Sequence, residues 1–481
     1  MSADAVIDPD GQWTAAQISR DATAVAQALG GRAGERVALL CAPGHDFMRA
    51  LLGCWQAGCV ALPLHPAHPD PELAYCVDDA GVTVVVASAM YEPLAQRLST
   101  SVVVLPPASL EPADASLRPL PPDAPAMLIY TSGTTGRPKG VVHTHGSLSA
   151  QVDALVEAWA WTPDDRTVLV LPLHHVHGIM AVCLSAWAIG ATCEAPGGFD
   201  ADATWERLAS REVTLFMAVP TIYARLIAAW EAADAATRAR WSAGASSLRL
   251  MVSGSAALPV AMLERWRELT GHVLLERYGM TEFGMALSNS LTQRVPGHVG
   301  EPLPGIEVRI VDEQGDDVAD GGEGELLVRG PALCTGYWGR PEETEAAFVD
   351  GWFRTGDVAV HEPAGYRLLG RSSVDIIKTG GEKVSALEIE EVYRSHPDIV
   401  DCAVVGLPDA EWGERVALAL VALVGTAPQS ESLQPESLRA FGKERLAVAK
   451  VPSRFLQLDE LPRNAMGKVT KRAVVDRFEE G

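Results

Sequence analysis

A loop rich in glycine and hydroxyl side chains is the first part of this sequence that suggests chemistry. It follows the apolar run Ala126–Tyr130 and reads Thr131, Ser132, Gly133, Thr134, Thr135, Gly136, Arg137, Pro138, Lys139 and Gly140. Glycines let backbone N–H groups approach phosphate oxygens, hydroxyls donate hydrogen bonds to them, and Lys139 offsets their charge. The loop therefore makes polyphosphate a candidate ligand, although a loop of this composition, taken alone, is usually only a turn.

A Walker-type phosphate loop is the first alternative, and the residues around Lys139 exclude it. That motif requires Gly-Lys-Ser/Thr leading into a helix. Here Lys139 is followed by Gly140 and Val141, so the hydroxyl that would bind the metal ion is missing.

Four further motifs follow the loop in order along the chain. They are Arg277-Tyr278-Gly279-Met280-Thr281-Glu282, Phe353-Arg354-Thr355-Gly356-Asp357, Gly370-Arg371 with Ile377-Lys378-Thr379-Gly380-Gly381-Glu382-Lys383, and Pro462-Arg463-Asn464-Ala465-Met466-Gly467-Lys468. Together with the loop they resemble the signatures of the adenylate-forming superfamily of acyl-CoA synthetases, peptide-synthetase adenylation domains and luciferases. The resemblance covers nearly the whole chain, and five motifs in order are far more specific than one.

The resemblance implies an ATP site with a named role for each motif. The loop from Thr131 to Lys139 would hold phosphates, Thr281 would touch the α-phosphate, and Glu282 would bind Mg²⁺ together with Thr131. Asp357 would accept the ribose hydroxyls, assisted by Arg371. The remaining ATP or AMP residues are Gly254, Ser255, Ala256 and Tyr278, which would frame the adenine, with Gly279 and Met280 beside them.

The implied reaction is ATP-dependent ligation of an acid to coenzyme A through an acyl-AMP. A carboxylate attacks the α-phosphorus and expels pyrophosphate, so a metal ion and cations must offset the repulsion between anions. Lys468 would bridge carboxylate and phosphate from a mobile C-terminal domain that then swings away for thioester formation. The hinge is expected at Ser372 or Ser373, and the CoA arm is expected to pass Gly380, Gly381, Glu382 and Lys383.

Arg277 narrows the choice of carboxylic acid substrate. Relatives that act on neutral acyl chains commonly have glycine at this position, and an arginine can donate two hydrogen bonds to a second carboxylate on the substrate. Arg225 and His177 also resemble malonyl-CoA synthetases, and the three residues are expected to share one pocket. Malonate or methylmalonate is the leading substrate, and the alternative explanation of Arg277 is an ion pair with an acid such as Glu276.

The triplet His174, His175 and His177 could suggest a metal site. We expect the first two to lie at the end of a strand, where adjacent side chains point to opposite faces. His177 is therefore interpreted as a substrate donor rather than as a metal ligand.

Alternating helical and strand patterns must position these residues. Apolar residues recur at helical spacing from Thr14 to Leu29, and a buried strand follows at Val37–Cys41. The alternation predicts an α/β fold with parallel sheets layered by helices over residues 1–370, including a small β-rich part at about 300–370. Residues 371–481 are expected to form a small mobile α+β domain, and the apolar run Gly178–Cys193 is read as a buried helix because it is too short to span a bilayer.

Composition restricts the class of partner. The 481 residues carry a formal net charge of −23, with 48% hydrophobic and 21% charged residues, which indicates a globular enzyme and disfavours nucleic-acid binding. The eight cysteines include no CxxC pair, and the N-terminus resembles no targeting segment, so a cytoplasmic location is expected. The sequence leaves monomer or dimer open.

Three other functions stay open. One is another short-chain or aryl acyl-CoA synthetase, and the second is an adenylation enzyme that loads a carrier protein. The third is a nucleotide-binding protein without catalysis, which the retention of Lys139, Glu282, Asp357 and Lys468 disfavours.

Overall fold

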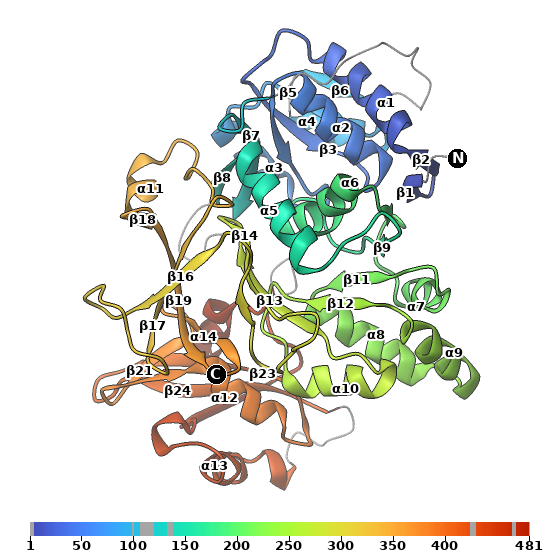
Figure 1. The fold of residues 1–481 in the computed structure, drawn as a ribbon. Helices are drawn as coiled ribbons and strands as arrows, with labels where there is room; N and C mark the ends of the chain where they lie inside the picture. The colour runs from blue at the N-terminus through green and yellow to red at the C-terminus, as the bar shows by residue number, and fades with distance from the viewer. Residues whose placement is uncertain are drawn as a thin grey trace.

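The computed structural model describes residues 4–98, 101–105, 120–131, 138–423, 430–463 and 468–480. Its named strands form four sheets, of nine, six, five and five strands. Figure 1 shows the six-stranded sheet in the upper part of the molecule, the nine-stranded sheet beside and below it, and the C-terminal sheet at the bottom. The candidate site residues lie on strands of these sheets and on the turns that connect them.

The six-stranded sheet has the order β6-β5-β3-β4-β7-β8, and only its last pair is antiparallel. Strands β3, β4 and β5 are almost entirely buried, as expected for parallel strands covered by helices on both faces. Its strands are β3 (Arg36–Leu40), β4 (Val60–Pro63), β5 (Val84–Ala87), β6 (Val102–Val104), β7 (Pro125–Thr131) and β8 (Lys139–Thr144). Its helices are α2 (His45–Gln56), α3 (Asp70–Ala80), η1 (Ala89–Tyr91) and α4 (Glu92–Leu98).

The nine-stranded sheet has the order β15-β14-β13-β12-β11-β9-β10-β1-β2, with antiparallel strands at both edges. Its strands are β1 (Asp4–Asp8), β2 (Gly11–Thr14), β9 (Arg166–Val168), β10 (Thr192–Glu194), β11 (Leu215–Ala218), β12 (Leu250–Ser253), β13 (Leu275–Met280), β14 (Gly284–Ser288) and β15 (Glu301–Pro302). The helices in this part are α1 (Ala15–Ala28), α5 (His145–Ala158), η2 (His177–Leu184), α6 (Ser185–Ile189), α7 (Ala201–Ala209), α8 (Pro220–Ala232), α9 (Ala235–Ala245) and α10 (Val260–Thr270).

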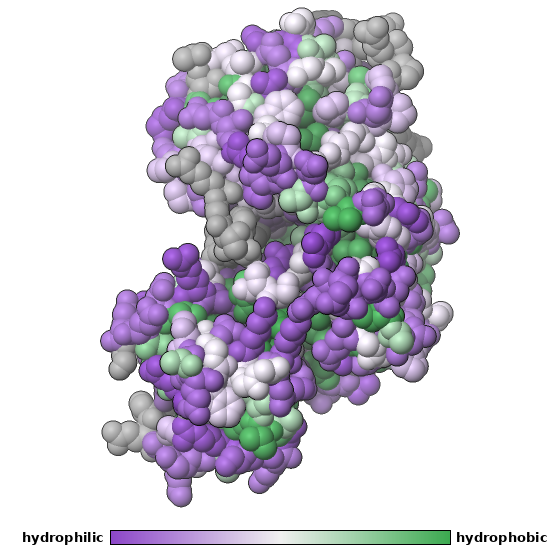
Figure 2. Space-filling model, turned by 90° about the vertical axis from the view of Figure 1, so that its left-hand side faces the viewer, coloured by the Kyte–Doolittle hydropathy of each residue, from purple (hydrophilic) through white to green (hydrophobic). Residues whose placement is uncertain are grey.

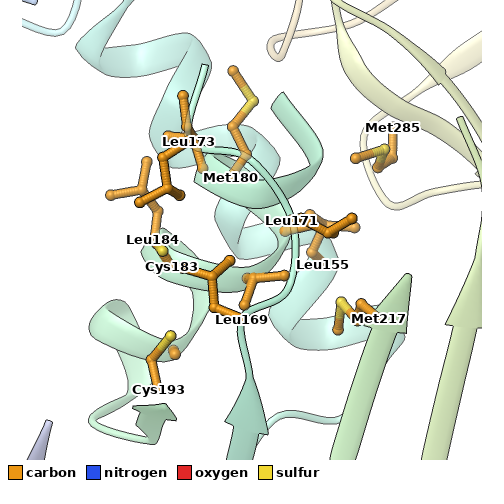
Figure 3. Packing of buried hydrophobic residues seen from close by; sticks show 14 of the residues in the cluster. Leu155, Leu169, Leu171, Leu173, Met180, Cys183, Leu184, Cys193, Met217 and Met285 are labelled. Atoms are coloured by element: carbon orange, nitrogen blue, oxygen red, sulfur yellow. The ribbon is translucent and has the colours of Figure 1, made fainter. Parts of the chain in front are cut away.

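Two expectations about this part can be compared with the structure. The helix expected from Thr14 is α1, and the Thr14 hydroxyl caps it by accepting from the Gln17 N–H at 3.3 Å. The apolar run Gly178–Cys193 is buried helix for most of its length, but it ends in β10 rather than in a helix. Figure 3 shows η2 packing its Met180, Cys183 and Leu184 side chains beside Leu169, Leu171 and Leu173.

The third and fourth sheets complete the chain. The β-rich part contains β16 (Glu307–Val311), β17 (Glu323–Arg329), α11 (Pro341–Ala347), β18 (Phe348–Val349), β19 (Trp352–Glu362) and β20 (Gly365–Arg371). The C-terminal part contains β21 (Ile376–Thr379), β22 (Glu382–Ser385), α12 (Ala386–Arg394), β23 (Ile399–Asp409), β24 (Gly413–Ala422), η3 (Glu431–Leu433), α13 (Pro435–Lys443), η4 (Val448–Lys450), β25 (Arg454–Leu458) and α14 (Lys471–Glu480). The domain boundary predicted after Gly370 falls at the end of β20, next to the turn that leads into β21.

The surface is hollowed at mid-height, between the upper part built on the six-stranded sheet and the lower part of the molecule (Figure 2). Within the described ranges, no helix is long and apolar enough to cross a bilayer. All eight cysteines are free thiols.

Candidate active site

The turn between β13 and β14 carries Thr281 and Glu282. Met280 pairs with Gly284 across this turn, and the strands approach so closely that a Cβ on Gly279 would lie 2.0 Å from the Gly284 carbonyl oxygen. The Thr281 carbonyl oxygen lies 2.7 Å from Nε2 of His143 on β8. Since a carbonyl can only accept, the imidazole is the donor, and the six-stranded sheet thereby holds a turn of the nine-stranded sheet.

Asp357 and Arg371, which are expected at the ribose, meet Tyr278, which is expected at the adenine. Asp357 lies opposite Arg371 in the β19–β20 pair. Its two carboxylate oxygens accept from the Tyr278 hydroxyl at 2.6 Å and from the Arg371 Nε at 3.0 Å. Three motifs that are far apart in the sequence therefore form one hydrogen-bonded group.

Glu282 has the properties of a ligand for a hard cation. Its side chain is buried, and burial raises its pKa, while a hydrogen bond from the Tyr337 hydroxyl at 2.9 Å lowers it. A carboxylate has about four lone-pair sites, so this contact leaves oxygen positions for a metal ion. Oxygen ligands of this kind suit Mg²⁺, and Glu282 fits the role that the sequence predicts.

The phosphate loop is described only at its two ends, where Thr131 pairs with Lys139 at the loop end of the β7–β8 hairpin. Ser132, Gly133, Thr134, Thr135 and Gly136 lie outside the described residues. The Tyr75 hydroxyl donates to the Pro138 carbonyl oxygen at 2.9 Å, and Lys139 Nζ lies 5.0 Å from the centroid of the Tyr337 ring. Lys139 and the carboxylate expected to bind the metal ion thus contact the same tyrosine.

Arg277 is buried without an anionic partner. Its side chain is 4% exposed, and burial lowers its pKa to about 9. Within the part of the chain that the structure describes, it forms no ion pair with a carboxylate, and its Nε has no hydrogen-bond acceptor. The alternative pairing with Glu276 is wrong: the Glu276 carboxyl accepts from the Gly297 N–H at 2.8 Å, because neighbouring side chains on a strand point to opposite faces.

Arg277 instead contacts Ser255, which also contacts His177. The guanidinium donates to the Ser255 hydroxyl at 3.2 Å, and that oxygen lies 3.3 Å from Nδ1 of His177. Burial, followed by the charge of Arg277, holds the pKa of His177 well below its ordinary value, and the Nε2 of this histidine has no partner. Gly254 completes the group, because a Cβ there would lie 2.5 Å from Cζ of Arg277.

Arg225 is not among these contacts. It is exposed on α8, and its guanidinium lies 4.6 Å from the centroid of the Phe199 ring. The structure therefore joins two of the three expected acid-binding residues directly, and a role for Arg225 stays a prediction.

Lys468 of the C-terminal part reaches the same region. The residue keeps a solvent-exposed surface, yet the pKa of its ammonium is lowered, first by desolvation and then by the charges of Arg371 and Arg277, against the opposing effect of Asp357. The ammonium is thus close to both the ribose-binding group and Arg277. This placement is compatible with the role in adenylation that the sequence predicts for Lys468.

The residues expected to serve as hinge and CoA site lie on neighbouring turns. Ser372 donates from its hydroxyl to the Gly356 carbonyl oxygen at 2.9 Å, and Ser373 follows it in the turn. Gly380 and Gly381 adopt φ angles of +57° and +85° between β21 and β22, which glycine accommodates without strain. Among the other two CoA candidates, Glu382 is exposed and Lys383 pairs with Glu313 at 2.5 Å, so both roles stay predictions.

The histidine triplet differs from its expected geometry. His174 and His175 lie in a turn after β9 rather than on a strand, and their ring centroids are 3.8 Å apart. His177 begins η2. The strand argument used for this triplet was therefore wrong, although the substrate-facing role of His177 is compatible with its contact to Ser255.

Two residues of the site were missed by the sequence analysis. Tyr337 lies between the motifs at residues 277–282 and 353–357, and His143 follows the phosphate loop by a few residues. Neither belongs to a motif that suggests phosphate chemistry. Their contacts with Glu282 and Thr281 depend on how two sheets pack, which spacing alone does not reveal.

The fold and this site define an enzyme that activates a substrate with ATP. A family model described as AMP-binding enzyme matches residues 1–338, and one described as AMP-binding enzyme C-terminal domain matches residues 388–468. The chain belongs to the AMP-binding enzyme family, and the expected class, an AMP-forming acid:CoA ligase, is confirmed. The expected cosubstrates and metal, ATP, CoA and Mg²⁺, are those that such ligases use.

Individual proteins that are similar to this chain include a malonate–CoA ligase and a solved structure of MatB. A mitochondrial malonate–CoA ligase of Mus musculus is 47% identical, and the match covers 92% of this chain and 82% of that protein. The crystal structure of ATP-bound MatB from Rhodopseudomonas palustris has a TM-score of 0.89 at 33% identity, over 99% of this chain and 96% of that one. The apo form of the same protein has a TM-score of 0.79 at 32% identity, with the same coverage, so this chain is arranged more like the ATP-bound form. The predicted α/β fold is confirmed.

Proposed function

We propose that this chain is an ATP-dependent ligase that joins malonate or methylmalonate to coenzyme A through an acyl-AMP. The observation that carries the choice of acid is the buried guanidinium of Arg277, which has no carboxylate partner among the residues that the structure describes. Relatives that match the chain closely include malonate–CoA ligases. A diacid has one carboxylate for the chemistry and a second for Arg277.

The energetic reason is the cost of an unpaired buried cation. Removing one partner from a buried ion pair typically destabilises a protein by about 3–5 kcal/mol, and a bound carboxylate restores the pair. With a pKa lowered to about 9, Arg277 is still protonated at neutral pH and can donate two hydrogen bonds to the distal carboxylate. A monocarboxylate of similar size would leave the guanidinium desolvated and unpaired, so Arg277 favours diacids.

In this proposal the other residues serve the two half-reactions. Lys468 and Arg371 offset the charge that gathers as a carboxylate oxygen attacks the α-phosphorus and pyrophosphate leaves. Asp357 holds the ribose, and Glu282 holds Mg²⁺, which would neutralise phosphate charge when bound. The CoA thiolate then attacks the acyl carbonyl and AMP leaves.

Pyrophosphate release by the purified enzyme tests the acid. We expect malonate or methylmalonate to give the highest kcat/KM among malonate, methylmalonate, succinate, acetate and propionate, with AMP and thioester formed in equal amounts. Arg277→Met should lower kcat/KM for malonate by about 10²–10³-fold, which corresponds to loss of a buried ion pair. The kcat/KM for propionate should change much less.

The matched control is Arg294→Met, because Arg294 is a half-buried arginine whose pKa is also lowered by burial, and it donates to the backbone carbonyls of Val273 and Leu291. It should leave the preference between malonate and propionate unchanged. If all the diacids fail while a monocarboxylate supports thioester formation, the substrate proposal is wrong. A parallel reaction with a phosphopantetheinylated carrier protein in place of CoA decides between the two acceptors.

The cytoplasmic location expected from the sequence is also a proposal. Eight free thiols suit a reducing compartment, while the mouse relative is mitochondrial by name. Fractionation of cells that express the chain decides between these compartments.

A further inference from the structure

A short segment between β17 and α11, Cys334–Trp338, joins two parts of the proposed ATP site. Along β8, the Trp338 N–H donates to the Gly140 carbonyl oxygen at 2.7 Å, and the Val142 N–H donates to the Gly336 carbonyl oxygen at 3.0 Å. At its other end, the Cys334 N–H donates to the Glu282 carbonyl oxygen at 2.7 Å. The segment is therefore bound to the strand that begins with Lys139 and to the turn that carries Glu282.

Within this segment, the Tyr337 side chain contacts both parts of the proposed ATP site. Its hydroxyl donates to Oε1 of Glu282 at 2.9 Å, and its ring faces Lys139 Nζ at 5.0 Å. The Tyr337 N–H donates to the Thr344 hydroxyl at 2.9 Å, and the adjoining backbone bonds to β8 hold the residue in place. One aromatic side chain thus contacts both the expected metal ligand and the expected phosphate-binding lysine.

We infer that Tyr337 is a positioning residue for Mg²⁺-bound ATP, which orients the Glu282 carboxylate through its hydroxyl and holds the Lys139 ammonium through its ring. The inference rests on the proposed ATP site and is independent of which acid the enzyme takes. Tyr337 itself needs no contact with the nucleotide.

The two contacts act on different charges. The hydroxyl donates to one carboxylate oxygen, which leaves the rest of the carboxylate for the metal ion and restricts its rotation. The ring attracts the ammonium through its negative face and limits the positions that the flexible lysine can adopt.

Two substitutions separate these contacts. Tyr337→Phe removes the hydroxyl and keeps the ring, whereas Tyr337→Leu removes both. Tyr393→Phe is the control, because Tyr393 is a buried tyrosine of the C-terminal part whose hydroxyl donates to the Leu438 carbonyl oxygen at 2.9 Å. Tyr393→Phe loses a similar hydrogen bond from a tyrosine hydroxyl, but in a part of the structure outside the proposed ATP site.

The measurement is ATP binding by isothermal titration calorimetry with and without Mg²⁺, which needs neither acid nor CoA. For Tyr337→Phe we expect the gain in ATP affinity on adding Mg²⁺ to fall about tenfold, while affinity without Mg²⁺ changes less than about twofold. Tyr337→Leu should show the same loss and, in addition, several-fold weaker binding of ATP without Mg²⁺. Tyr393→Phe should match the wild type in both measurements.

Two results would overturn the inference. One is an unchanged or larger effect of Mg²⁺ in Tyr337→Phe, and the other is the same ATP binding in Tyr337→Phe and Tyr337→Leu. Thermal melting identifies loss of folding in the leucine variant, and the phenylalanine variant then decides alone. A wrong substrate for the enzyme would leave these binding ratios untouched, so the two proposals fail separately.

Discussion

Glu276 and Arg277 are neighbours on β13, yet burial acts on them in opposite directions. Burial raises the pKa of Glu276 to about 8, and it lowers the pKa of Arg277 to about 9. Both shifts favour the neutral form, because charge is costly away from water. The glutamate faces Gly297 while the arginine faces Ser255. The two side chains therefore lie on opposite faces of β13, and the proposed acid substrate would meet Arg277 and not Glu276.

Glu276→Gln should stabilise the protein at alkaline pH. The folded-state pKa of about 8 lies above the ordinary glutamate value of 4.5, so the folded wild type holds a proton that it loses as pH rises through the folded pKa. Its stability therefore falls between about pH 4.5 and pH 8 by at most about 1.4 kcal/mol per pH unit. The glutamine keeps the oxygen that accepts from Gly297 and does not titrate.

Thermal unfolding from pH 5 to pH 9 measures this difference. The advantage of Glu276→Gln over the wild type should grow up to about pH 8 and then level off. The exposed Glu345→Gln is the control and should follow the wild type. An advantage that is constant or that grows toward acid pH would contradict the assignment.

At the scale of elements, helix α10 is capped by a residue of the other domain. Its N-cap is Pro259, which makes no side-chain cap, and its first turn has no acidic residue. Glu391 on α12 accepts from the Val260 N–H at 3.0 Å instead, which satisfies a free donor at the helix N-terminus and places a carboxylate at its positive end. The contact links the two domains in the arrangement that brings Lys468 to the site.

Glu391→Ala should weaken this arrangement. We expect adenylation, measured as ATP–pyrophosphate exchange, to slow by about 3–10-fold, because a helix cap contributes about 1 kcal/mol. Thioester formation from a supplied acyl-AMP should change less than twofold. The control is Glu388→Ala on the same helix, which loses an ion pair with Lys450 inside the C-terminal part, and equal slowing of both half-reactions by Glu391→Ala would contradict this role.

At the scale of the whole molecule, the C-terminal part is docked with its Lys468 near Arg371, Arg277 and Asp357. The β21–β22 turn is engaged elsewhere: a Cβ on Gly380 would lie 2.9 Å from the Trp412 ring, and Lys383 pairs with Glu313. In this position of the C-terminal part, Lys468 lies at the proposed adenylation site and the β21–β22 turn does not. Thioester formation then requires a second position, as the resemblance to adenylate-forming enzymes implies.

Lys468→Ala should separate the two half-reactions. Loss of the ammonium should reduce formation of the acyl-AMP by about 10²-fold or more, because a cation that offsets transition-state charge is removed. Thioesterification of a supplied acyl-AMP should be largely intact, since the lysine has left the site by then. Rapid-quench assays of each half-reaction measure this, and equal losses in both would refute the proposed division of labour.

Much of the site could be predicted because its motifs combine local geometry with chemistry. Asp357, Arg371 and Tyr278 were each assigned to ATP from the sequence, and the structure brings them together. Tyr337 and His143 could not be found in this way. Their roles depend on contacts across 55 and 138 positions of sequence, respectively, and a tyrosine or histidine alone carries no such information.

The sequence by itself determined the reaction class and the alternation of helices and strands. Both follow from short-range rules, since apolar periodicity sets the elements and hydroxyl, glycine and charged residues at fixed spacing set the phosphate chemistry. Only the tertiary structure decided that Arg277 is buried, with no carboxylate partner in the described part of the chain, and that Glu276 faces away from it. The physical reason is that burial and pairing depend on which surfaces meet when the sheets pack, and the charge of a side chain becomes available to a substrate only where packing leaves it unpaired.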